Sequence, residues 1–146
     1  APGGVDPKRV EAVRALLDRA GIPTTVHDDE TALMWAKLGF LAPFALLTTA
    51  HRAPIGEVRT THRAELEALV REVAAVAAAS GAPSDPERTL RFYDRFGPDA
   101  KSSMLRDAEA GRPLETDAVG GAIVRAADRA GVDAPLTRAL VERLRG

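Results

Sequence analysis

The sequence lacks cysteine altogether, and this absence excludes disulfide bonds and thiolate chemistry. It also lacks an excess of charge of either sign, because its 20 basic and 21 acidic residues nearly cancel. A chain without a basic surface has no electrostatic footprint for nucleic acid or an anionic membrane, so we expect neither as a partner. The first nine residues, APGGVDPKR, lack the apolar segment of a signal peptide, and we expect a cytoplasmic protein.

Histidine is also scarce, with only His27, His51 and His62 in 146 residues. Their spacing is not that of a metal-binding motif. We therefore expect surface or loop positions for all three and no metal site. Any chemistry must then rest on other residue types.

The most apolar part of the chain is Thr31–Ala50, TALMWAKLGFLAPFALLTTA, in which Lys37 is the single charge. The stretch has transmembrane length, but a lysine, a glycine and a proline interrupt it and three acidic residues precede it. We expect a buried helix of a soluble protein. An ammonium group among apolar side chains is costly unless something pairs with it. Lys37 therefore either reaches solvent from a core helix or is kept for chemistry.

The chain length allows one domain with a real core, and helix signals recur along it. Asp6-Pro7 and Asp85-Pro86 each predict an N-cap followed by a first-turn proline, while Pro43 is expected to kink or split the apolar helix. The sum is an all-α, multi-helix bundle of six or seven helices with short connections. The exception is Ile22–His27, whose β-branched residues predict a short strand that would need a partner from elsewhere.

A second informative stretch is Lys101–Gly121, KSSMLRDAEAGRPLETDAVGG. Ser102-Ser103 reads either as a helix N-cap or as the start of a helix that binds a small carboxylate or phosphate. Glu115 and Asp117 are expected at a helix start because of the helix dipole. Gly120-Gly121 inside that helix predicts close approach of another backbone or of a ligand.

Together, W-x-K-L at Trp35–Leu38 and S-S-M-L-x-D-x-x-x-G-R-x-x-E-x-D at Ser102–Asp117 resemble the ketopantoate reductase family, which reduces 2-dehydropantoate with NADPH in pantothenate synthesis. The resemblance is to the helical C-terminal half, over residues 30–146. It implies a bundle like the C-terminal domains of ketopantoate reductase and 6-phosphogluconate dehydrogenase. Residues 1–29 resemble the closing helix and strand of the nucleotide-binding half.

The resemblance also implies roles for particular residues. Lys37 would be the general acid that protonates the carbonyl oxygen, and Glu115 the carboxylate that orients it. Ser103 would bind the carboxylate of a small 2-oxo-acid substrate, and Ser102 and Asp107 would also belong to the substrate-binding site. NADPH would be held mainly by an N-terminal half, because no G-x-G-x-x-G follows a strand here. This chain alone should then be inactive, and the face that it exposes predicts a homodimer.

Two positions depart from the family pattern. Leu41 and Ala45 stand where the family commonly has asparagines, one and two turns after Lys37, so the pocket should be less polar. They favour an alternative, a non-catalytic helical interaction module that kept the fold and lost the substrate. The joint presence of Lys37, Ser103 and Glu115 opposes that alternative.

Overall fold

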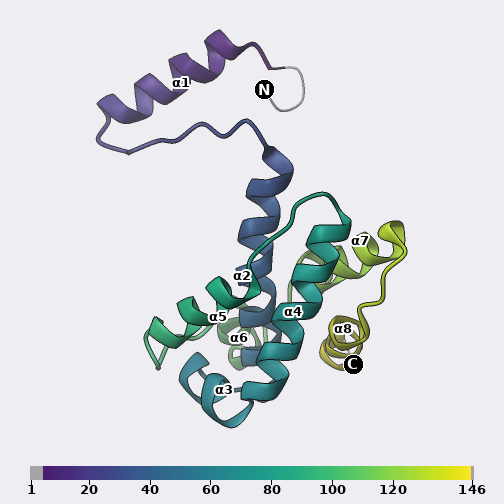
Figure 1. Ribbon diagram of the computed structural model, residues 1–146. Helices are drawn as coiled ribbons and strands as arrows, with labels where there is room; N and C mark the ends of the chain where they lie inside the picture. The colour runs from purple at the N-terminus through teal and green to yellow at the C-terminus, as the bar shows by residue number, and fades with distance from the viewer. Residues whose placement is uncertain (1–4, 146) are drawn as a thin grey trace.

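Helix α2 (Glu30–His51) forms the axis of the bundle, and the other helices of the C-terminal part surround its second half (Figure 1). The computed structural model describes residues 5–145, which form eight α-helices and one π-helical turn and contain no strand. The predicted all-α fold is therefore confirmed. After α2 the elements are α3 (Ile55–Thr61), α4 (Arg63–Ala79), α5 (Pro86–Arg95), α6 (Ser103–Glu109), the π-helix η2 (Asp117–Gly121), α7 (Ala122–Ala130) and α8 (Pro135–Arg145).

Helix α2 begins where Asp29 caps it, since the Asp29 side chain accepts a hydrogen bond from the Ala32 N–H at 2.9 Å. Its length and hydropathy would allow it to cross a membrane, but every residue from Ala42 to Ala50 is buried inside the bundle. The helix therefore serves as the core element around which the others pack.

Pro43 does not split α2, which runs unbroken through it. The proline has no N–H to donate to the Gly39 carbonyl, so the ladder loses one bond at this point. The next carbonyl, that of Phe40, accepts a hydrogen bond from the buried Tyr93 hydroxyl of α5. Burial raises the pKa of Tyr93, so the hydroxyl stays a proton donor. Packing against α5 thus supports the helix at its proline.

Helix α1 (Pro7–Arg19) stands away from the bundle, and it buries none of its residues (Figure 1). The segment that links it to α2 contains Ile22–His27, and the prediction of a strand there is wrong. A strand needs a neighbour for its backbone groups, and the described residues supply none. Thr24 instead donates its N–H to the Asp18 side chain at 3.0 Å, which ties the link back to α1.

Gly120 is a point of close packing between the C-terminal helices and α2. A Cβ atom there would lie 2.4 Å from Val141 Cγ2 and 3.2 Å from Leu46 Cδ2. A neighbour does approach Gly120 closely, but it consists of side chains of α8 and α2, so the prediction of another backbone or a ligand at Gly120 is wrong. The helix expected from Glu115 contains the π-helical turn over Asp117–Gly121, which sequence periodicity does not signal.

Helix α8 receives its cap from a distant helix. The Glu72 carboxylate of α4 accepts the backbone N–H groups of Leu136 at 2.9 Å and Thr137 at 2.7 Å. It also accepts the Thr137 hydroxyl at 2.7 Å. A carboxylate at a helix N-terminus satisfies unpaired N–H groups and opposes the positive end of the dipole. Glu72 thus fixes α8 against α4.

Candidate functional site

Lys37 lies on the exposed side of α2, at a cavity of about 420 Å³ between α2 and the η2–α7 segment. Leu38 and Leu41 line it from α2, and Ala118 and Val119 line it from η2. The walls are mostly apolar, and the only ionisable groups among them are Lys37 and Arg129. Two cations beside apolar walls suit a small anion that carries an apolar group.

Glu115 is exposed and lies just before the helix that forms the opposite wall of this cavity. It precedes the cavity-lining residues Ala118 and Val119 by only three and four positions, which places it near the wall that faces Lys37. Among the described side chains, however, no ion pair joins Lys37 to Glu115. The role of Glu115 in orienting the lysine remains a prediction.

Ser102 and Ser103 are adjacent, but they have opposite surroundings. Ser102 is only 2% exposed and caps α6, because its Oγ accepts the Leu105 N–H at 3.0 Å. Its hydroxyl also lies 2.8 Å from Thr48 Oγ1 on α2. Ser103 is exposed. The capping interpretation therefore describes Ser102, and Ser103 is the hydroxyl of the pair that a ligand can reach.

Asp107 is half-buried, and its carboxylate accepts a hydrogen bond from Arg112 Nε at 2.8 Å. The Asp107 carbonyl also accepts the Arg112 N–H at 2.9 Å. These contacts fix the turn after α6, from which the chain continues to Glu115. Since an ionised carboxylate repels a substrate carboxylate, the geometry supports Asp107 as a residue that positions this turn.

The two departures at α2 have different consequences. Leu41 borders the Lys37 cavity and makes its wall apolar. Ala45 is only 2% exposed and belongs to the core. The predicted loss of polarity therefore falls on Leu41, one turn after the lysine.

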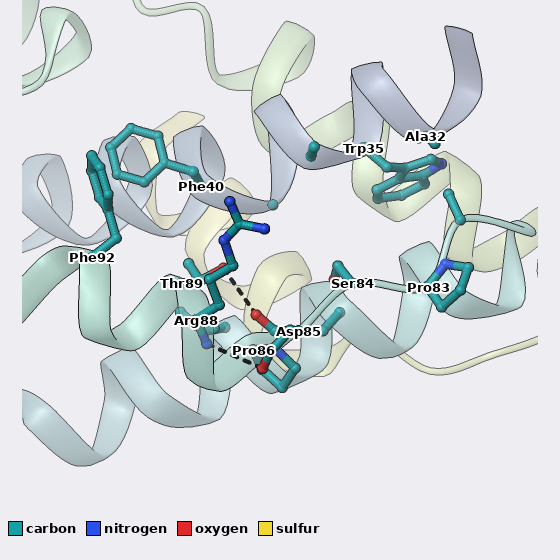
Figure 2. A pocket seen from close by; sticks show the side chains of 15 residues that line it. Ala32, Trp35, Phe40, Pro83, Ser84, Asp85, Pro86, Arg88, Thr89 and Phe92 are labelled. Carbon is teal, nitrogen blue, oxygen red and sulfur yellow. Dashed lines mark hydrogen bonds between the residues drawn. The ribbon is translucent and has the colours of Figure 1, made fainter. Parts of the chain in front are cut away.

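A second cavity, of about 520 Å³, lies on the other side of Trp35, which borders both (Figure 2). Figure 2 shows Phe40 and Phe92 at one end of the cavity, Trp35 and Pro83 at the other, and the start of α5 at Asp85 and Arg88 between them. The Asp85 side chain caps α5 by accepting the Arg88 N–H at 3.1 Å. The sequence signals the cap but not the cavity, which depends on how α2, α4 and α5 meet.

Two of the three histidines do not occupy the surface or loop positions that we expected from the sequence. His27 is exposed in the link before α2, as predicted, but His51 and His62 are partly buried at helix ends. Their rings stack with centroids 3.6 Å apart, and His51 Nε2 lies 2.7 Å from Glu65 Oε2. The interpretation as scattered surface or loop residues is wrong for this pair, because the α2–α3–α4 turns bring the two histidines together.

The chain is thus an all-helical domain that carries a lysine beside an apolar cavity. More particularly, the family described as "Ketopantoate reductase PanE/ApbA C terminal" matches residues 29–146, and the chain belongs to this family. The resemblance to the ketopantoate reductase family that the sequence motifs indicated is confirmed.

Comparisons with individual proteins support membership of this family. The chain is 30% identical over 147 residues to the uncharacterized oxidoreductase YkpB of Bacillus subtilis, covering 94% of this chain and 48% of YkpB. It is 31% identical over 138 residues to the 2-dehydropantoate 2-reductase of Archaeoglobus fulgidus, covering 93% and 47%. The crystal structure of 2-dehydropantoate 2-reductase from Methylococcus capsulatus superposes with a TM-score of 0.88 at 31% identity, over 99% of this chain and 47% of that one. The chain thus spans about half the length of these relatives.

Proposed function

We propose that this chain is the substrate-binding and catalytic-acid half of an NADPH-dependent 2-oxo-acid reductase similar to ketopantoate reductase. The observation that carries the proposal is Lys37, a lysine exposed at the edge of an apolar cavity whose opposite wall follows Glu115. Membership of a reductase family supports the same assignment.

The chemistry needs a proton donor at the carbonyl oxygen. Hydride adds to the carbonyl carbon, the C=O electron pair moves to oxygen, and the alkoxide takes a proton from the Lys37 ammonium. The positive charge also stabilises the oxygen as negative charge develops on it. Glu115 would keep Lys37 charged and correctly oriented.

The substrate would be a small 2-oxo acid with an apolar side chain. Leu41 and Val119 offer apolar contact for the side chain, and Arg129 offers a second positive charge for the carboxylate. Ser103 would contribute a hydroxyl from the start of α6. The product would be the corresponding 2-hydroxy acid, and 2-dehydropantoate is the first candidate substrate.

NADPH would supply the hydride. The described residues contain no strand, whereas a dinucleotide phosphate loop lies between a strand and a helix. We infer that a separate nucleotide-binding half holds the coenzyme and that this chain is inactive by itself. Residues 30–146 would form the helical half, and residues 1–29 the end of the nucleotide-binding half.

The experiment is to measure NADPH consumption by the protein that contains both halves, with 2-dehydropantoate beside branched 2-oxo acids that lack its hydroxyl. Turnover of 2-dehydropantoate would show that Leu41 is a tolerated substitution. Turnover only of the other acids would assign a changed specificity to the apolar wall. No turnover of any acid would contradict the proposal and favour the helical interaction module.

We also propose a cytoplasmic homodimer. Large apolar side chains are exposed along the first part of the chain, including Val13, Leu16, Leu33 and Met34, and exposed apolar surface favours association. Light scattering coupled to size exclusion should give twice the chain mass at micromolar concentration. A clean monomer would contradict the dimer and leave the reductase assignment intact.

A further inference from the structure

We propose that His51, His62 and Glu65 form a binding site for a divalent transition-metal ion such as Zn²⁺. The site lies where α2, α3 and α4 meet, away from the residues that line the Lys37 cavity. Its occupation does not depend on the reductase activity, and the two proposals can fail separately.

The ligands come from the end of α2, from the junction between α3 and α4, and from the start of α4. His51 is the last residue of α2, His62 joins α3 to α4, and Glu65 lies in the first turn of α4. One potential ligand atom from each side chain lies within 4.8 Å of the other two. The fold therefore gathers donors that are 14 residues apart along the chain.

The donor set indicates which ions fit. Two imidazoles and one carboxylate suit Zn²⁺, Co²⁺, Ni²⁺ or Cu²⁺, whereas Mg²⁺ and Ca²⁺ prefer all-oxygen sites. Three protein ligands of this kind leave a position for water, as in open zinc sites. The side chains of His51 and Glu65 are 15% and 34% exposed, so the pair is sheltered but water can reach it.

The potential ligand atoms lie within 4.8 Å of one another, which is close to the spacing of ligand atoms around a bound metal ion. Metal–ligand bonds of about 2.0–2.2 Å in a tetrahedral site place neighbouring ligand atoms about 3.3–3.6 Å apart. His51 Nε2 and Glu65 Oε2 are already 2.7 Å apart. The adjustment required is thus a small movement of side chains within an existing cluster.

The stacked rings define that movement. The planes of His51 and His62 are 15° apart, so the lone pairs of the two rings lie in nearly parallel planes and do not meet at one point. One ring must turn about its terminal torsion, which is broad for histidine. His62 does not lie inside a helix, because it occupies the junction between α3 and α4. We expect His62 to turn while His51 stays beside Glu65.

The charge of Arg63 does not block an ion. Arg63 follows His62 directly, but its guanidinium is paired with Glu67 at 2.7 Å and with Asp94. Once bound, the ion would join the end of α2 to the start of α4. Because the unfolded chain has no preformed site, binding should stabilise the fold.

The test is titration of the EDTA-treated, dialysed 146-residue chain with ZnCl₂, followed by calorimetry and by thermal unfolding. We expect one ion per chain, a higher Tm with Zn²⁺, and no response to Mg²⁺. Co²⁺ should give visible absorption bands that Zn²⁺ abolishes. His62→Ala should weaken Zn²⁺ binding by more than about tenfold, because even partners outside the ligand sphere contribute 10–100-fold. Glu65→Gln should also weaken it.

His27→Ala is the matched control, since it removes the exposed histidine outside the cluster and should leave binding unchanged. Circular dichroism shows whether each variant is folded. If a variant is not folded, the Co²⁺ bands of the unmodified chain still decide. Absence of Zn²⁺ binding or of Co²⁺ bands in the unmodified chain would overturn the site, as would equal affinity in His62→Ala.

Discussion

The hydroxyl groups of Thr48 and Ser102 lie 2.8 Å apart in the core and join α6 to α2. Thr48 donates its proton to the Phe44 carbonyl at 2.7 Å, so Ser102 donates to Thr48. Ser102 Oγ in turn accepts the Leu105 N–H. This chain of hydrogen bonds orients the first turn of α6, and with it the neighbouring Ser103.

Substitution of Ser102 should lower the stability of the fold, whereas substitution of Ser103 should affect substrate binding. Ser102→Ala removes a cap and leaves Thr48 without its donor, so it should lower the free energy of unfolding by about 1–3 kcal/mol. Ser103→Ala should change it by less than about 0.5 kcal/mol, because the side chain is exposed. Urea unfolding measures both values. In the protein that contains both the nucleotide-binding and the helical half, Ser103→Ala should raise KM. An unchanged KM would show that Ser103 does not bind the substrate.

In the protein that contains both halves, Lys37→Ala should lower kcat far more than it raises KM. Loss of a general acid costs about 10²–10⁴-fold in rate. Lys8→Ala is the control, because Lys8 is an exposed lysine of α1 outside the cavity. Steady-state kinetics decides, and a nearly normal kcat in Lys37→Ala would exclude the lysine from proton transfer.

Glu72→Ala should destabilise the fold by about 2–4 kcal/mol, because it leaves the N-terminus of α8 without its carboxylate cap. Glu142→Ala removes an exposed carboxylate of α8 itself and should cost less than about 0.5 kcal/mol. Chemical unfolding of the two variants is the measurement. Equal stability of both would show that the contact with α8 contributes nothing.

Gly120→Ala should destabilise by about 1–3 kcal/mol through overpacking against Val141. The added methyl group should be accommodated when Val141→Ala is introduced as well, so the double variant should recover part of the loss. Gly39→Ala, in α2, meets no atom within 4 Å and should instead stabilise by up to about 1 kcal/mol through helix propensity. Thermal unfolding of the three variants tests these signs.

Local rules predicted the features that depend on neighbours in sequence. The Asp6 and Asp85 side chains do cap the helices that begin at Pro7 and Pro86. The apolar helix around Lys37 and the cap at Ser102 were also predictable. Each follows from a few adjacent residues and their hydrogen-bonding groups.

Features that depend on distant residues were not predictable in this way. Glu72 reads as an ordinary surface acid of α4 until α8, 64 residues later, places two N–H groups against it. His51 and His62 likewise become neighbours only through the turns at α3. The strand prediction at Ile22–His27 failed for the opposite reason, because local β preference cannot replace a missing partner strand.

None of the described residues before Trp35 is buried, so the core draws on no described residue earlier than Trp35. Sequence drift in α1 and the link after it therefore leaves the packing of the bundle unchanged. Recombination at this boundary can join the bundle to a different preceding segment without disturbing its core. Inheritance of the helical half is thus physically separable from that of whatever precedes it.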